Sequence, residues 1–168
     1  MEIVKKYFAD FTPQQEQQLT ALRDLYSSWN EKINVISRKD MDNFYMHHVL
    51  HSLAITTQFN FKKNMQVMDL GCGGGFPGVP LAIFFPDTHF HMVDSINKKL
   101  TVINEISGEI GLKNITTNIP GQKILRTGSL TQLFRGQLLL LKICGNGANH
   151  SLKKIKINRK MTLTGSFV

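Results

Sequence analysis

The residues most able to do chemistry are two acids and a run of glycines near the middle of the chain. Asp69 ends an apolar run and is followed by Gly71, Gly73 and Gly75, and Asp94 ends the next apolar run about twenty residues later. Glycine lets a backbone approach a ligand closely, and a carboxylate after a second strand suits the hydroxyls of a ribose. The spacing therefore predicts a site for a nucleoside cofactor.

The elements around these residues predict an α/β domain. Apolar runs indicate three strands, at 67–70, 89–93 and 115–119. Apolar residues at helical spacing indicate two helices between them, at 78–85 and 100–110. This alternation requires a parallel sheet with right-handed crossovers, and such sheets bind ligands at the carboxyl ends of their strands.

The first sixty residues predict a helical region. Thr12 is expected to cap a helix that starts at Pro13 and buries a stripe formed by Leu19, Leu22, Leu25, Tyr26 and Trp29. After a polar connection over 30–40, a second helix is expected over 41–54. We expect Trp29 and the other aromatic residues to belong to the core.

The second predicted helix carries three histidines, His47, His48 and His51. Their spacing places them near one another on a helix, as in some metal sites, but no acid or further ligand at a suitable spacing accompanies them. The pattern favours a packing or hydrogen-bonding role, with substrate contact and metal binding as alternatives. We predict no metal site.

Length and composition indicate one soluble domain with an appendage. The chain has 168 residues, of which 42% are hydrophobic, and it contains no apolar run of the roughly 20 residues that a membrane span needs. No apolar signal core follows the charged N-terminus, so a cytoplasmic protein is expected. Cys72 and Cys144 indicate neither a disulfide framework nor a zinc site.

The excess of positive over negative charge is confined to the last part of the chain. Residues 1–120 contain 11 Lys and Arg and 12 Asp and Glu, whereas residues 121–168 contain 9 Lys and Arg and no acid. The net charge of +8 is therefore no property of the predicted α/β region. A basic, RNA-binding tail is one interpretation of this distribution.

The glycine spacing separates two classes of cofactor. A dinucleotide fingerprint would place a third glycine where this chain has Phe76. The pattern from Asp69 through Gly71 and Gly73 to Gly75 instead resembles the first motif of class I S-adenosylmethionine-dependent methyltransferases. A nicotinamide-dependent oxidoreductase remains as the alternative.

The longer sequence resembles one RNA-modifying family, the bacterial 16S ribosomal RNA guanine-N7 methyltransferase G family, also called glucose-inhibited division protein B. The resemblance covers about residues 8–120, and the distinctive segments are 69–82, 85–86 and 93–99, with 29–34 and 48–53 in the helical region. It implies a Rossmann-like class I methyltransferase fold with a mostly parallel sheet. We expect residues 1–60 to form an N-terminal helical region and residues 61–120 to form the first half of the cofactor-binding domain.

The resemblance also implies a cofactor, a substrate and a set of binding residues. The cofactor is S-adenosyl-L-methionine, and the substrate is 16S ribosomal RNA or the small ribosomal subunit. Gly71 and Phe76 are expected to contact the cofactor by resemblance, and Asp69, Gly73, Gly75 and Asp94 by the logic of the motif. No general base is assigned, because guanine N7 carries no proton. We expect a monomer.

The last part of the chain departs from the family. After the third strand the family shows Arg-Ala-Glu and later Ser-Arg-Ala-Val, and neither is present. Codons compatible with segments 121–123, 130–139 and 143–146, read one nucleotide earlier, encode Arg-Ala-Glu, then a segment with Ser-Arg-Ala-Val, then Asp-Leu-Trp-Lys. We therefore expect a one-nucleotide frameshift near codons 118–120, which makes 121–168 a basic tail outside the family.

Such a tail would leave the cofactor domain incomplete at its C-terminal side, because the later strands of a doubly wound sheet cover its helices and close the crevice. A poorly stable product with weak or absent activity is expected. An RNA- or ribosome-binding fragment without turnover is therefore the second alternative.

Overall fold

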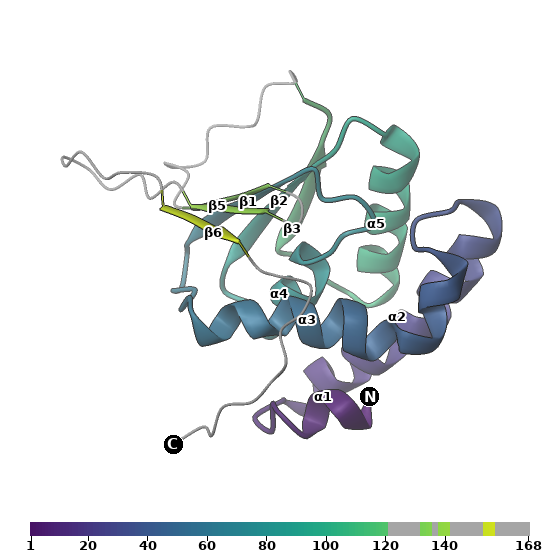
Figure 1. Cartoon of the computed structure of the whole chain (residues 1–168), viewed down its shortest axis with the longest axis horizontal. Helices are drawn as coiled ribbons and strands as arrows, with labels where there is room; N and C mark the ends of the chain where they lie inside the picture. Colours follow the sequence, from purple (N-terminus) through teal and green to yellow (C-terminus); the bar gives the residue numbers. More distant parts are fainter. Residues whose placement is uncertain (121–131, 136–137, 142–152, 157–168) are drawn as a thin grey trace.

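The computed structural model describes residues 1–120 in full and, beyond them, the backbone of three short strands at 132–135, 138–141 and 153–156 (Figure 1). The N-terminal region begins with helix α1 (Glu2–Lys5) and continues with the long helix α2 (Pro13–Lys32). Among the residues that the structure describes, no helix is both long and apolar enough to cross a membrane.

Helix α2 starts at the predicted residue. The Thr12 hydroxyl accepts a hydrogen bond from the Gln15 backbone N–H, and the Gln15 side chain accepts one from the Thr12 N–H, which forms a capping box. The helix runs to Lys32. Residues 30–32, expected in a polar connection, therefore belong to its last turn, and Asn30 is buried.

The second N-terminal helix is not the single α-helix that the sequence predicted. The chain forms a 3-10 turn η1 (Arg38–Asn43), a π-helical segment η2 (Tyr45–Leu50), one turn of α-helix α3 (His51–Leu53) and a further 3-10 turn η3 (Ala54–Thr57). Aromatic and histidine residues have low helix propensity, and the Ser52 hydroxyl bonds to the His48 carbonyl within the segment. Both features favour irregular turns over a regular α-helix.

The sheet has three parallel strands at its described core. Strand β1 (Gln66–Leu70) lies between β2 (His89–Val93) and β4 (Gln132–Arg135), and β3 (Ile115–Asn118) lies outside β2. All of these pairs are parallel. The parallel arrangement of β1, β2 and β3 confirms the prediction from alternating strands and helices.

The sheet continues beyond β4 with two antiparallel strands, β5 (Leu138–Leu141) and β6 (Lys153–Lys156), in the order β3-β2-β1-β4-β5-β6. Segment 138–141 consists of four consecutive leucines, an apolar run that suits a buried strand. Its backbone pairs with β6 and, at one position, with β4. The side chains of these strands lie outside the described part of the structure, as do the rest of residues 121–168.

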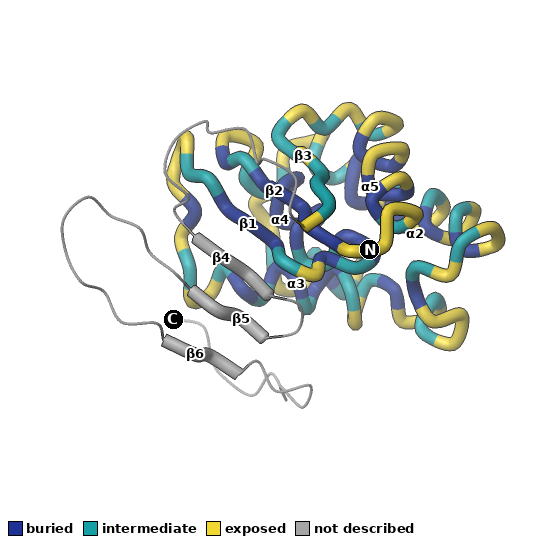
Figure 2. Tube along the Cα trace, turned by 90° about the horizontal axis from the view of Figure 1, so that it is seen from above, coloured by how far each residue is buried: buried dark blue, intermediate teal, exposed yellow. Residues whose placement is uncertain are grey.

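Two helices connect the parallel strands. Helix α4 (Gly78–Phe84) links β1 to β2, and α5 (Asn97–Glu109) links β2 to β3. Strands β1 and β2 are buried along most of their length, whereas the outward turns of α2 and α5 are exposed (Figure 2).

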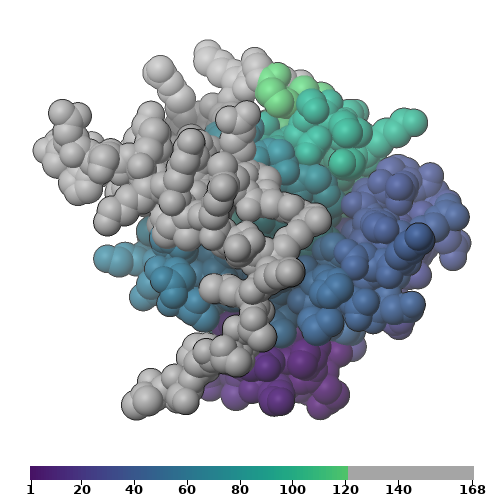
Figure 3. All heavy atoms as spheres, in the orientation of Figure 1, coloured from purple at the N-terminus to yellow at the C-terminus, as the bar shows by residue number. Residues whose placement is uncertain are grey.

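One apolar core joins the N-terminal helices to the α/β part. It contains Leu19, Leu22 and Tyr26 from α2 together with Phe90 and Ile103 from β2 and α5. The N-terminal segments form a continuous surface with the rest of the described chain in Figure 3. Buried Gln18 donates to the carbonyl of Ile110, which lies 92 residues further along the chain, at 2.8 Å. Helix α2 therefore uses the α/β part to satisfy its buried polar groups.

Candidate functional site

The glycine loop, residues 71–77 between β1 and α4, lies at the carboxyl end of β1. Its entry is fixed to the neighbouring strand, because the N–H groups of Gly71 and Cys72 both donate to the carbonyl of Val93, at 2.7 and 3.1 Å. Backbone hydrogen bonds therefore join the loop to the end of β2. This is the edge of the sheet where the sequence predicted a ligand site.

Two glycines of the loop have opposite surroundings, although both have positive φ. A Cβ atom at Gly75 (φ 96°) would lie 2.8 Å from a methyl carbon of Val79 and 2.9 Å from the hydroxyl of Tyr26, so packing excludes any side chain. A Cβ atom at Gly73 (φ 56°) would have no atom within 4 Å among the described residues. Gly75 therefore serves the close packing of the loop, and Gly73 presents bare backbone on its open side.

Asp94 is brought to the glycine loop, as its position after the second strand predicted. One carboxylate oxygen accepts a hydrogen bond from the Gly73 N–H at 2.8 Å, and the other accepts from the Ile96 N–H at 2.9 Å. The side chain is buried, at 8% exposure. A carboxylate can accept about four hydrogen bonds, so acceptor capacity is left beside the open face of Gly73.

Asp69 lies in β1, next to the first residue of α4. It is fully buried, and one oxygen accepts from the Gly78 N–H at the start of α4 at 3.3 Å. The other oxygen, Oδ1, has no hydrogen-bond partner among the described residues. Burial raises the pKa of this carboxyl to about 7, the Gly78 hydrogen bond opposes the shift, and the charge of Asp94 adds to it. Asp69 thus holds the first turn of α4.

Phe76 turns its ring toward the N-terminal helices. Its centroid lies 4.9 Å from that of Tyr26, 5.0 Å from His48 and 5.8 Å from Phe44. Such spacings are typical of attractive ring contacts. The residue that the resemblance placed in the cofactor site is therefore also the point where the loop meets the helical region.

The histidines group around one acid. His47 Nδ1 lies 2.8 Å from one oxygen of Asp40, and His48 Nε2 lies 3.4 Å from the other. Burial lowers the pKa of His48, and the nearby Asp40 carboxylate partly offsets that shift. The hydrogen bond to Asp40 and the ring contact of His48 agree with a packing and hydrogen-bonding role. Among the residues described, no group of three or more His, Cys, Asp or Glu side chains is arranged to hold a metal ion.

Two residues of α2 that sequence reasoning did not assign to the site support the loop directly. The fully buried Tyr26 donates its hydroxyl hydrogen to the Gly74 carbonyl at 2.6 Å. Asn30 accepts from the N–H groups of Val35 and Ile36, at 2.9 and 3.0 Å, and donates to the Ile36 carbonyl at 2.8 Å. A signal for Asn30 was available, because it lies four residues after Tyr26 and so shares the buried face of the helix.

Asn30 fixes a segment that touches the loop. The Val35 carbonyl oxygen lies 3.0 Å from where a Cβ atom at Gly74 would stand. Cys72, in the same loop, is buried, and this burial raises the pKa of its thiol strongly. Cys144 lies outside the described residues. The glycine loop is therefore packed from below by α2 and the Asn30-bound segment.

The parallel strands, the glycine loop and the acid at the end of β2 define an α/β domain of the nucleoside-binding type. The sequence model of a family described as GidB, rRNA small subunit methyltransferase G, matches residues 15–119. The chain therefore belongs to the rRNA small subunit methyltransferase G family. This membership confirms the resemblance found in the sequence and decides against a nicotinamide-dependent oxidoreductase.

Individual relatives agree with the family. The Ribosomal RNA small subunit methyltransferase G of Bacteroides thetaiotaomicron is 61% identical over 116 residues, which are 69% of this chain and 56% of the relative. That of Cytophaga hutchinsonii is 53% identical over 117 residues, 70% of this chain and 56% of the relative. The chain thus spans about half the length of the curated relatives it matches.

A solved structure of a SAM dependent methyltransferase from Aquifex aeolicus overlaps with 55% of this chain and 50% of its own, at 19% identity and a TM-score of 0.43. The fold class rests on the strand order of this chain and on its family.

Proposed function

We propose that residues 61–120 form the first half of an S-adenosylmethionine site, and that the family reaction this site serves is methylation of guanine N7 in 16S ribosomal RNA. The observation that carries the proposal is the hydrogen bond from the Gly73 N–H to Asp94, which places a carboxylate beside bare loop backbone. Family membership supplies the class of reaction.

The proposed cofactor-binding residues fit a nucleoside with a charged amino-acid end. Asp94 has acceptor capacity for ribose hydroxyls, and Gly71 and Gly73 offer backbone without side chains. Buried Asp69 has one oxygen without a partner among the described residues, which a donor on the ligand could use. Gly75 and Phe76 complete the set, because they shape the loop from beneath.

The chemistry proposed for this site requires no proton transfer. When bound, S-adenosylmethionine supplies an electrophilic methyl group on a sulfonium. Guanine N7 is an acceptor with a free lone pair, so a new N–C bond can form as the S–C bond breaks, and no base has to act first. The protein's contribution is then to hold the guanine in line with the S–C bond that breaks, and to exclude water. We assign no catalytic residue.

We propose further that residues 121–168 are read out of frame. The family match ends at residue 119, and the 48 residues after position 120 contain nine basic residues and no acid. Codons compatible with these residues, read one nucleotide earlier, can encode Arg-Ala-Glu and then Ser-Arg-Ala-Val, in the order of the family. Sequencing the gene across codons 115–125 tests this, and synonymous codons incompatible with the shift would remove the proposal.

A comparison of two chains tests the function. The present chain and a chain from a gene with the frame restored would each be incubated with small ribosomal subunits and methyl-labelled S-adenosylmethionine, and the RNA digested to nucleosides. We expect 7-methylguanosine from the restored chain and little or none from the present one. A restored chain that leaves N7 unmodified would refute the proposed reaction.

A calorimetric titration tests separately whether the cofactor site of the present chain is incomplete and whether the chain binds RNA. Tight, stoichiometric binding of S-adenosylmethionine by the present chain would contradict an incomplete site. RNA binding without turnover by the present chain would agree with the alternative of a non-catalytic RNA- or ribosome-binding chain. We also propose a cytoplasmic monomer, which size-exclusion chromatography with light scattering would check.

A further inference from the structure

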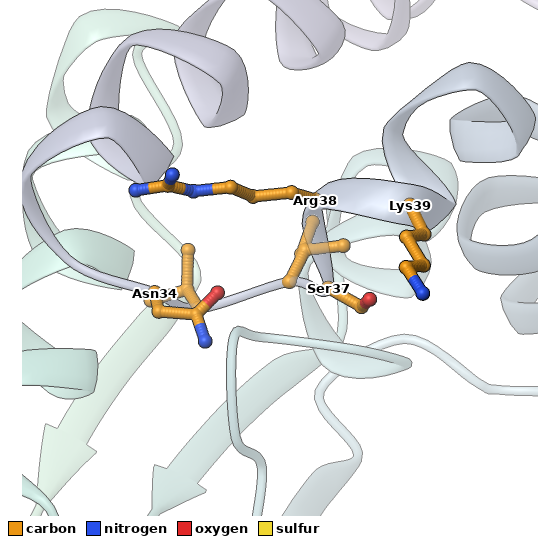
Figure 4. A pocket seen from close by; sticks show the side chains of 6 residues that line it. Asn34, Ser37, Arg38 and Lys39 are labelled. Carbon is orange, nitrogen blue, oxygen red and sulfur yellow. The ribbon is translucent and has the colours of Figure 1, made fainter.

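A hollow of about 520 Å³ lies between α2 and η1, and the family reaction as proposed does not explain it. It is lined by the six consecutive residues 34–39, among them Asn34, Ser37, Arg38 and Lys39 (Figure 4). Figure 4 shows the Arg38 side chain extending across the hollow toward Asn34, with Lys39 at the other side. Polar groups therefore line the hollow on two sides, Arg38 and Asn34 on one and Ser37 and Lys39 on the other (Figure 4).

The charge of the lining suits an anion. Arg38 and Lys39 are exposed, and neither forms an ion pair with another described residue within 4 Å. No lining residue is acidic. The adjacent acid, Asp40, directs both of its oxygens to His47 and His48. The side chains of Arg38 and Lys39 are thus available to bind an anion, although residues 1–120 as a whole contain slightly more acids than bases.

The segment is held in place and does not depend on a ligand for its shape. The three hydrogen bonds from Asn30 to Val35 and Ile36 fix its backbone, and Asn30 is only 4% exposed. A site whose backbone is ordered beforehand loses less entropy when a ligand binds. The cations therefore stand on a preorganised support.

The hollow also lies near the glycine loop. The carbonyl oxygen of Val35, one of its lining residues, lies 3.0 Å from where a Cβ atom at Gly74 would stand. A chain of nucleotides held at Arg38 and Lys39 would therefore pass close to the glycine loop. Phosphates contribute most of the position-fixing contacts in protein–nucleic acid complexes, and arginine and lysine are the usual partners.

We propose that the hollow formed by residues 34–39 is a phosphate-binding subsite for the RNA strand, with Arg38 and Lys39 as its cations and Asn34 and Ser37 as neutral hydrogen-bonding groups. The inference rests on the proposed function, since it names where the RNA substrate of that site is held. Asn30 is a positioning residue for the subsite.

The test is the salt dependence of RNA binding by the full chain. A short, fluorescently labelled single-stranded RNA would be titrated by anisotropy at several salt concentrations with the wild type, with Arg38→Gln/Lys39→Gln, and with the control Lys62→Gln/Lys63→Gln. The control removes the same charge from exposed lysines that precede β1, at the end of the strand opposite the loop. Any RNA affinity of the basic tail is common to all three chains.

For two lost phosphate contacts we expect the slope of log affinity against log salt to fall by about 1.4, and the affinity to fall roughly tenfold near physiological salt. The control should keep the wild-type slope to within about half of that change. Equal slopes for the hollow variant and the control would overturn the proposal, as would a wild type that binds no RNA.

Binding of S-adenosylhomocysteine, measured by calorimetry on the same three chains, distinguishes failure of the subsite from failure of the proposed function. Cofactor product that binds equally to all three, with RNA affinity lost only in the hollow variant, supports the subsite. RNA methylation by a frame-restored chain that tolerates Arg38→Gln/Lys39→Gln with unchanged KM for RNA would overturn the subsite and leave the function standing.

Discussion

Removal of the Tyr26 hydroxyl should destabilise the glycine loop from the side on which α2 packs. In Tyr26→Phe the ring keeps its contacts with Phe76 and Phe44, and only the 2.6 Å hydrogen bond to the Gly74 carbonyl is lost. Gly74 is buried, so its carbonyl oxygen is left without a partner in a place that water does not reach. The cost of a buried group left unsatisfied in this way is about 1–3 kcal/mol.

The chain offers a matched control in Tyr45. Its hydroxyl donates to the Thr20 carbonyl at 2.9 Å, but at an exposed position, where water can replace the lost partner. Tyr45→Phe should therefore change the free energy of unfolding by less than about 0.5 kcal/mol.

The assay is urea unfolding followed by circular dichroism, combined with amide hydrogen exchange of loop residues 71–77. We expect Tyr26→Phe to lower the free energy of unfolding by more than the control does, and to speed exchange at the Gly75 N–H, which bonds to the Cys72 carbonyl at 2.9 Å. Equal destabilisation by the two variants, with unchanged exchange in the loop, would refute the view that α2 supports the loop.

Three further predictions concern other supports of the same site. Gly75→Ala should destabilise the folded chain by about 2–4 kcal/mol, because its Cβ would meet Val79 at 2.8 Å and its φ is 96°. The control Gly108→Ala lies in open space on α5 and should be neutral or stabilising by up to about 1 kcal/mol, and thermal unfolding compares the two variants. Asn30→Ala removes three buried hydrogen bonds and should cost about 2–4 kcal/mol in urea unfolding; a loss below 1 kcal/mol would contradict this role. Burial raises the pKa of Asp69 to about 7 in the folded chain, so the folded state holds a proton that the unfolded state releases near pH 4. The free energy of unfolding should therefore decline by a few kcal/mol from about pH 4 to pH 7. Asp69→Asn should flatten that decline in unfolding curves measured across this range.

The backbone of the site was predictable because its determinants are local. Alternating apolar runs and turn residues predicted β1, β2, β3 and the helices between them, and the ends of two parallel strands necessarily bring Asp94 to the loop that follows β1. The capping box at Thr12 is likewise local, although its partner is Gln15 and not the acid one residue further on.

What the sequence did not predict depends on contacts between distant residues. Tyr26 belongs to an ordinary apolar stripe until its hydroxyl is seen to reach Gly74, 48 residues later. Asn30 looks like part of a polar connection by composition, and only its spacing of four residues from Tyr26 indicates the buried face of the helix. The π-helical segment begins directly after Phe44, and the rings of Phe44 and His48 both pack against Phe76, which no local pattern in the sequence shows.

The role assigned to Asp69 shows the same limit. An acid at the end of a strand can face a ligand or hold the turn that follows, and both arrangements have the same spacing in sequence. The hydrogen bond to the Gly78 N–H identifies the second arrangement for one oxygen of this carboxylate.

The buried polar side chains of α2 have a consequence for how the chain is made. Gln18 bonds to a carbonyl 92 residues later and Tyr26 to one 48 residues later. As the chain leaves the ribosome, this helix emerges long before either partner exists, and docking it early would bury both groups without hydrogen bonds. Native contacts so far apart in sequence also form slowly. Helix α2 is thus synthesised before its partners and is among the last elements to be locked in place, and the glycine loop takes its final shape in that same step.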